Sequence, residues 1–289
     1  MRRETGFLAV YTLASAAAVL FGVAVLALNG SMGSWPRNLV AWLVGALFAF
    51  VLARVRPNAA SVWAMLLIPL FGIAATFAAP DVQGVHRWVD IGPLHVNIAA
   101  LLLPMAIVAL AALGVNRVAA IAAALALAAL LMLQPDASQA TGLLAAVFFL
   151  SLRAEGSPVG RVAVVGSVAI AALVAWLRPD RLQPVDEVEQ IFALAWRTSK
   201  LLACFAVAAL ACTCLSPLLL IGRPDIRAAA LALSAYFLTV SLAPLLGVFP
   251  VPLVGLGMSF PVGFWLGIGS LEALRRRAAA PRIRQAGSV

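Results

Sequence analysis

The stretch LAVYTLASAAAVLFGVAVLAL, residues 8–28, decides the fold class of this chain. It contains no charged residue and matches the roughly 20 residues that a helix needs to cross a bilayer. Arg2 and Arg3 precede it, as in a signal peptide, but the apolar run is too long for one and further apolar runs follow. We therefore predict that residues 8–28 form an uncleaved first membrane-spanning helix.

The composition of the whole chain points the same way. Of the 289 residues, 64% are hydrophobic and only 11% are charged, whereas soluble domains are about half apolar and a quarter charged. Lipid cannot satisfy backbone groups, so spanning segments must be helices or a closed barrel. Because the apolar runs are continuous rather than alternating, the sequence predicts an all-α integral membrane protein.

The apolar runs predict a polytopic bundle of about ten transmembrane helices. It forms one domain, residues 1–289, with short basic tails at residues 1–7 and 275–289. Several runs are shorter than a straight crossing needs. The predicted spans are residues 8–28, 39–52, 60–79, 96–113, 118–133, 140–152, 162–177, 191–221, 228–248 and 251–274.

The net charge of +9 is interpreted as a topology signal rather than as a sign of nucleic-acid binding. With the N-terminus inside, most of the 20 Lys and Arg residues fall on the inner side and most acids on the outer side. We therefore predict that both termini are cytoplasmic. The arginines at residues 275–277 would lie against anionic membrane lipids, at about 1 kcal/mol per charge.

The stretch QGVHRWVDIGPLHV, residues 83–96, is a charged and aromatic loop in this apolar chain. As an interfacial anchor, Trp88 would lie at the headgroup level and Arg87 would contact phosphates. As part of a site, the same pair could hold a lipid diphosphate or the face of a sugar. The loop alone favours the anchor.

Three further stretches carry polar residues on the outer side. LQPDASQA (residues 133–140) is a helix start in which Asp136 lies at the positive end of the dipole. PVDEVEQIFA (residues 184–193) is either a solvated acidic loop or the source of a general base. FPVPLVGLGMS (residues 249–259) predicts a broken helix start that lines a cavity.

In this order the four stretches resemble motifs of the SEDS family, the FtsW, RodA and SpoVE polymerases of cell division, elongation and sporulation. The family motifs are G-x-x-R-W-I-x-L-G, Q/E-P-D-L-G-T-A, P-E-x-x-T-D-F-I-F-A and I-P-L-P-F-I-S-Y-G-G-S. The resemblance covers roughly residues 84–259. It implies a multi-pass protein of the bacterial cytoplasmic membrane that acts in cell-wall synthesis, cell division or cell shape.

The resemblance also implies a peptidoglycan glycosyltransferase that polymerises lipid II at the outer face of the membrane. Glu189 occupies the place of the key acid and would be the catalytic base, with Asp186 and Glu187 as substitutes. The implied substrate-binding residues are Arg87, Trp88, Asp136, Arg197, Lys200 and Ser259. Family members work with a class B penicillin-binding protein, a transpeptidase, and are helped by a divalent cation (Mg²⁺ or Mn²⁺), for which the sequence assigns no ligands.

The chain departs from the family pattern within several motifs, for example at residues 137–139, where Ala-Ser-Gln replaces Leu-Gly-Thr. Glu189 stands where the family has Asp, and Ala100 stands where the family has Glu. Arg197 and Lys200 lie in the predicted span 191–221, where the family has acids; they either snorkel to the surface or face a polar cavity. A non-catalytic SEDS-like scaffold is therefore the alternative function, and a flippase or transporter of lipid-linked precursors the second alternative.

Overall fold

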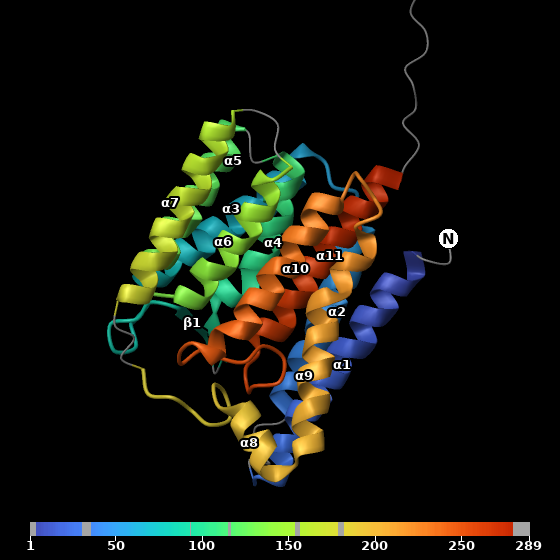
Figure 1. Ribbon diagram of the computed structural model, residues 1–289, viewed down its shortest axis with the longest axis vertical. Helices are drawn as coiled ribbons and strands as arrows, with labels where there is room; N and C mark the ends of the chain where they lie inside the picture. Colours follow the sequence, from blue (N-terminus) through green and yellow to red (C-terminus); the bar gives the residue numbers. More distant parts are fainter. Residues whose placement is uncertain are drawn as a thin grey trace, which may run out of the picture.

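The computed structural model describes residues 4–30, 36–92, 94–114, 117–153, 157–178 and 182–279. Residues 1–3 and 280–289 of the two predicted basic tails lie outside these ranges. Within them the chain is helical apart from one β-hairpin and its connecting segments (Figure 1). The helices are α1 (Glu4–Leu28), α2 (Pro36–Arg54), α3 (Ala59–Ala75), α4 (Ile98–Leu113), α5 (Val118–Leu133), α6 (Ala137–Ser151), α7 (Pro158–Leu177), α8 (Ile191–Thr198), α9 (Lys200–Leu215), α10 (Arg227–Leu242) and α11 (Ser259–Ala279).

The helices confirm the predicted polytopic, all-α fold. Six are long and apolar enough by themselves: α1, α2, α3, α7, α9 and α10, three of them with short 3₁₀ extensions. The helices α4, α5 and α6 are apolar but shorter, and α11 adds 21 residues. The chain is therefore a multi-pass membrane protein.

The short helices explain why polar segments are buried in the bundle. A helix of 16 residues, such as α4 or α5, rises about 24 Å, less than the ~30 Å of a hydrocarbon core. The polar residues next to these helix ends consequently lie close to the hydrocarbon core of the membrane. Non-helical backbone is tolerated there only when the protein itself satisfies it.

Helix α11 lies inside the bundle and contacts α2 and α4 extensively. Its small residues permit close approach of the backbones, as is common between membrane helices. A Cβ atom on Gly263 would come within 2.1 Å of the Ala100 carbonyl oxygen on α4. The same helix carries Phe264, which stacks on Phe237 of α10 with ring centroids 3.9 Å apart.

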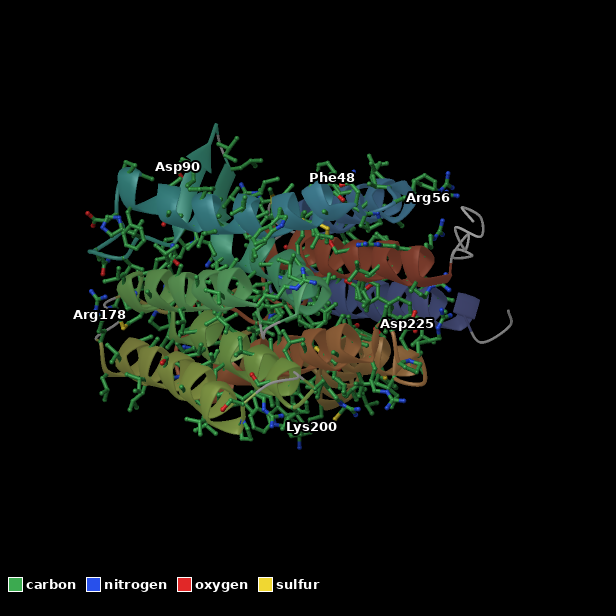
Figure 2. All side chains as sticks on the ribbon, turned by 90° about the horizontal axis from the view of Figure 1, so that it is seen from above. Phe48, Arg56, Asp90, Arg178, Lys200 and Asp225 are labelled. Carbon is green, nitrogen blue, oxygen red and sulfur yellow. The ribbon has the colours of Figure 1, made fainter. Side chains whose placement is uncertain are left out.

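Charged residues lie at both ends of the bundle, and the predicted orientation of the two ends stays a prediction. Figure 2 shows Asp90 and Arg178 at one end and Arg56 and Asp225 toward the other. The first residues of α1 and the last of α11 lie at one end of the bundle (Figure 1), as an even number of crossings requires. We refer to this end, which carries Arg54 and Arg56, as the inner end, and to the hairpin end as the outer end.

Three predicted spans have different boundaries in the structure. Span 191–221 is not one helix, because Ser199 adopts an extended conformation (φ −162°, ψ 122°) and separates α8 from α9. Span 96–113 begins as a strand and becomes helical only at Ile98. Span 251–274 becomes helical only at Ser259, after a non-helical segment.

Candidate functional site

The first motif forms a β-hairpin at the outer end of the bundle. Strand β1 (Trp88–Ile91) pairs antiparallel with β2 (Leu94–Asn97), and Trp88 faces Asn97 across the ladder. Gly92 in the connecting turn has φ +59°, a conformation that glycine adopts without steric cost. The hairpin leads directly into α4, whose first turn is capped by the Asn97 side chain, which accepts from Ala100 N at 2.9 Å.

Arg87 joins the first motif to the second. Its Nη2 donates to the Pro135 carbonyl oxygen, and its Nε lies 3.7 Å from Asp136 Oδ2. The two side chains are 4% and 3% exposed. The two charges therefore neutralise each other inside the protein, where an uncompensated charge would be expensive.

Asp136 is also the N-cap of α6. Its Oδ1 accepts from Gln139 N at 3.3 Å and from Ser138 Oγ at 2.9 Å. A carboxylate at this position satisfies orphan N–H groups and faces the positive end of the helix dipole. This confirms the helix start predicted for the Gln-Pro-Asp stretch. Its predicted role in substrate binding stays a prediction.

The exposed face of the hairpin carries an aromatic pair. Trp88 stacks on His95 of β2 with ring centroids 5.1 Å apart. Asp90 Oδ1 lies 2.5 Å from His95 Nδ1, and both of these side chains are at least half exposed. Trp88 is half-buried, so it presents ring surface at the outer end of the molecule, as either predicted reading requires.

Ser259 fixes the fourth motif to the hairpin. It is the first residue of α11, and its hydroxyl oxygen accepts from Asn97 N at 2.9 Å. The side chain is buried. Ser259 therefore holds the start of α11 against the base of β2; direct contact with substrate stays a prediction.

The third motif folds into a compact turn that contains all three predicted acids. Glu189 N donates to the Val185 carbonyl oxygen at 3.0 Å, and Glu189 Oε2 accepts from Val185 N at 2.8 Å. The Glu189 side chain thus closes its own turn and is half-buried. Asp186 is exposed, and Glu187 is half-buried.

Backbone hydrogen bonds dock this turn on the fourth motif. Val251 N donates to Val188 O at 3.1 Å, and Leu256 N donates to Glu187 O at 2.8 Å. A Cβ atom on Gly255 would come within 2.4 Å of the Val188 carbonyl oxygen, so the close approach requires glycine. The segment before α11 therefore touches the acidic turn and, through Ser259, the hairpin.

Asn38, near the start of α2, clamps the same segment from the other side. Its Nδ2 donates to Gly255 O at 2.9 Å, and its Oδ1 accepts from Gly257 N at 3.0 Å. The residue is fully buried. One amide side chain therefore holds two backbone groups of this segment, of which the Gly255 carbonyl oxygen is buried and needs a partner.

We expect the substitution Asn38→Ala to destabilise the protein by about 1–3 kcal/mol, because it leaves the buried carbonyl oxygen of Gly255 without its partner. The free energy of unfolding, measured in detergent micelles, tests this. Asn29→Ala is the control, since Asn29 is exposed and bonds Thr198 at 2.9 Å. A loss for Asn38→Ala no larger than that for Asn29→Ala contradicts the clamp.

Arg197 and Lys200 do not lie within a continuous span, which corrects the prediction. Arg197 lies on the short helix α8, whose residues Ile191 and Ala195 are buried while Trp196 and Arg197 are exposed. Lys200 begins α9, and its Nζ lies 5.6 Å from the centroid of the Trp196 ring. Figure 1 shows α8 at the outer end of the bundle, where such an amphipathic helix meets the membrane surface.

The predicted residues thus form two connected groups at the outer end. One comprises Arg87, Trp88, Asp136 and Ser259, and the other the acidic turn with Glu189. The segment before α11 joins them. In the part of the chain that is described, no three His, Cys, Asp or Glu side chains form a metal-binding cluster, and the divalent cation stays a prediction.

Sequence reasoning missed the supporting polar residues. Asn38, Asn97 and Tyr236 were not singled out, although Tyr236 OH donates to Gln139 Oε1 at 2.5 Å. Gln134 Nε2 similarly donates to Thr76 Oγ1 at 2.7 Å. The available signal was a lone amide or hydroxyl next to an apolar run, since such groups need partners in a membrane.

The overall fold matches known structures. The chain is similar to the rod shape determining protein RodA of Thermus thermophilus, with a TM-score of 0.69 and 21% identity over 92% of this chain and 96% of that one. An aspartate-to-alanine mutant of the same RodA gives a TM-score of 0.64 and 22% identity, over 92% and 97%. A chain described in a study of how a peptidoglycan synthase complex coordinates polymerization and crosslinking gives 0.61 and 21%, over 93% and 98%.

No protein-family model and no curated protein matches the sequence itself. The structural likeness extends over nearly the whole of each chain. The chain therefore has a RodA-like fold, which confirms the architecture that the resemblance to the SEDS family predicted.

Proposed function

We propose that this protein is a divergent SEDS-family member that polymerises lipid II into glycan strands at the outer face of the bacterial cytoplasmic membrane. The observation that carries the proposal is the convergence of the four motif segments. They are far apart in the sequence, yet the hairpin, the α6 cap, the acidic turn and the start of α11 contact one another at one end of a RodA-like bundle.

The chemistry follows from the groups at this end. Glycosyl transfer from a lipid diphosphate needs a base that takes the proton from the attacking sugar hydroxyl. Glu189 is the proposed base, with Asp186 and Glu187 as neighbouring carboxylates. The exposed cations Arg197 and Lys200 would hold the leaving diphosphate at the membrane surface, and Trp88 would pack on the sugar or lipid.

Arg87 and Asp136 have a positioning role in this proposal. Their charges already face each other inside the protein, so in this conformation they hold the hairpin against α6. A direct contact with substrate would require the pair to open. Arg87 and Asp136 would therefore contact the substrate only in a different conformation of the same site.

A class B penicillin-binding protein is the proposed partner. The support is that one structural neighbour comes from a peptidoglycan synthase complex in which polymerization and crosslinking are coordinated. The proposed complex would place a transpeptidase beside the outer end, where new glycan strands emerge.

The test is a polymerisation assay with purified protein and labelled lipid II, with and without the transpeptidase partner. Glycan strands resolved by gel electrophoresis are the expected product. Mg²⁺, Mn²⁺ and chelator arms measure the dependence on a divalent cation. The absence of polymer in every arm, from protein that remains folded, would overturn the proposed polymerase activity.

A non-catalytic scaffold is the second candidate, and one observation favours it. Ala100, which stands where the family has a Glu, is fully buried at the contact between α4 and α11, so this position cannot supply a carboxylate. A scaffold predicts that the protein binds the transpeptidase and stays inert with each lipid-linked sugar.

A further inference from the structure

A cavity of about 210 Å³ opens at the inner end of the bundle, far from the motif segments. Helices α1, α2 and α11 form its walls, with Leu8, Ala46 and Phe50 among its apolar lining residues. An engineered cavity of ~150 Å³ accommodates benzene, so this volume is sufficient for part of an acyl chain.

Two arginines stand at the rim of this cavity. Arg54 is in the last turn of α2, is exposed, and lies 4.1 Å over the Phe50 ring. Arg276 is in the last turn of α11, and its side chain is 47% exposed. An apolar cavity with two cations at its mouth is complementary to a phospholipid, which has apolar chains and a negative headgroup.

The position of Arg276 is fixed by an acid beneath it. Glu272 is fully buried, and its two carboxylate oxygens accept from Arg275 at 2.6 and 2.8 Å and from Arg276 Nε at 2.7 Å. Two guanidinium groups therefore share one carboxylate, so this cluster retains a net positive charge. If Glu272 bonded a single arginine, the two charges would cancel and no net positive charge would remain.

A buried donor lies in the wall of the cavity. Trp265 lines it and is only 6% exposed, yet its indole Nε1–H has no hydrogen-bond partner among the described residues. A buried donor is normally satisfied. The indole nitrogen itself has almost no accessible surface, so Trp265 meets the cavity with other atoms of its ring.

We propose that this cavity binds an anionic phospholipid of the inner leaflet, with its phosphate between Arg54 and Arg276 and an acyl chain along α2 and α11. Arg–phosphate contacts provide the charge recognition. The apolar lining provides the affinity for the chain. The lipid would brace α1, α2 and α11, two of which carry Asn38 (α2) and Ser259 (α11) at their outer ends.

The test is native mass spectrometry of the full-length protein, released from bilayers with equal amounts of phosphatidylglycerol and phosphatidylcholine of identical acyl chains. The wild-type protein should retain phosphatidylglycerol in preference. The double variant Arg54→Gln/Arg276→Gln should lose about thirtyfold in affinity for it. Ala46→Phe, which fills the cavity and leaves all charges in place, should also lose it.

The matched control is Arg56→Gln/Arg117→Gln, which removes two exposed inner arginines that do not line the cavity. It should retain the lipid. Three outcomes would overturn the site: equal retention of both lipids by the wild type, equal loss in the control and the rim variant, or displacement of the lipid by millimolar inorganic phosphate. The first comparison uses only wild-type protein, so it does not depend on whether any variant folds.

Discussion

Replacing Glu189 by alanine is expected to lower the rate of lipid II polymerisation by about 10²–10⁴-fold, the usual contribution of a positioned general base. The structure complicates the interpretation of that single variant. The Glu189 carboxylate also accepts from Val185 N at 2.8 Å, so alanine removes the proposed base and loosens the turn together.

Glu189→Gln separates the two effects. The amide oxygen of glutamine can still accept from Val185 N, but a neutral amide cannot take a proton. If Glu189 is the base, Gln and Ala should be equally inactive in the polymerisation assay, and both proteins should stay folded. Full activity of Glu189→Gln would instead assign Glu189 to the stability of the turn.

The neighbouring acids provide a matched comparison. Asp186 is exposed, and the carbonyl of Glu187 bonds Leu256 N, a backbone contact that substitution of its side chain leaves in place. Asp186→Asn and Glu187→Gln should therefore each cost much less activity than Glu189→Gln. A larger loss from either would transfer the role of the base to that residue.

The sequence predicted the segments of the site but not how they meet. Hydropathy identified the spans because lipid permits few alternatives to apolar helices. Arg87 and Asp136 were both singled out, yet nothing local indicated that they pair, since they lie in different loops. Pairing is a property of tertiary packing, and short-range pattern does not encode it.

The boundary errors at Ser199 and at strand β2 have local causes. Ser199 lies in the polar stretch 197–200, between two apolar segments that the prediction joined into one span. Its extended conformation is supported by its own hydroxyl, which accepts from Leu202 N at 3.4 Å. The predicted span 96–113 included Val96 and Asn97, the last two residues of strand β2, because Val96 adjoins the apolar run of α4. The alternation of Leu94 and Val96 with His95 and Asn97 was the strand signal that this reading overlooked.

The substitution Asp136→Asn is expected to destabilise the protein by about 3–5 kcal/mol, because it leaves the buried Arg87 guanidinium without its counter-charge. Asparagine retains an oxygen that can accept from Gln139 N, so the loss would not come from the helix cap. The free energy of unfolding in detergent micelles measures the effect. A loss below about 1 kcal/mol would contradict the assignment of this pair as buried and charged.

The double variant Arg87→Met/Asp136→Leu tests the pair as a unit. Replacing both members of a buried ion pair by apolar groups of similar size is often neutral, whereas each single change leaves a charge or an empty partner. The double variant should therefore lose less stability than the two single variants together. It would lose the α6 cap, about 1 kcal/mol, so complete recovery is not expected.

The exposed pair on the same hairpin shows why burial decides the magnitude. Asp90 and His95 lie closer together than Arg87 and Asp136, 2.5 Å against 3.7 Å, but their side chains are 64% and 50% exposed. Water screens such a pair and solvates each partner when the other is removed. Asp90→Asn should therefore change stability by less than about 1 kcal/mol, although distance alone would rank it above Asp136→Asn. If Asp90→Asn and Asp136→Asn lower the free energy of unfolding equally, the distance between the charges, rather than their desolvation, would set the strength of ion pairs at the outer end of this bundle.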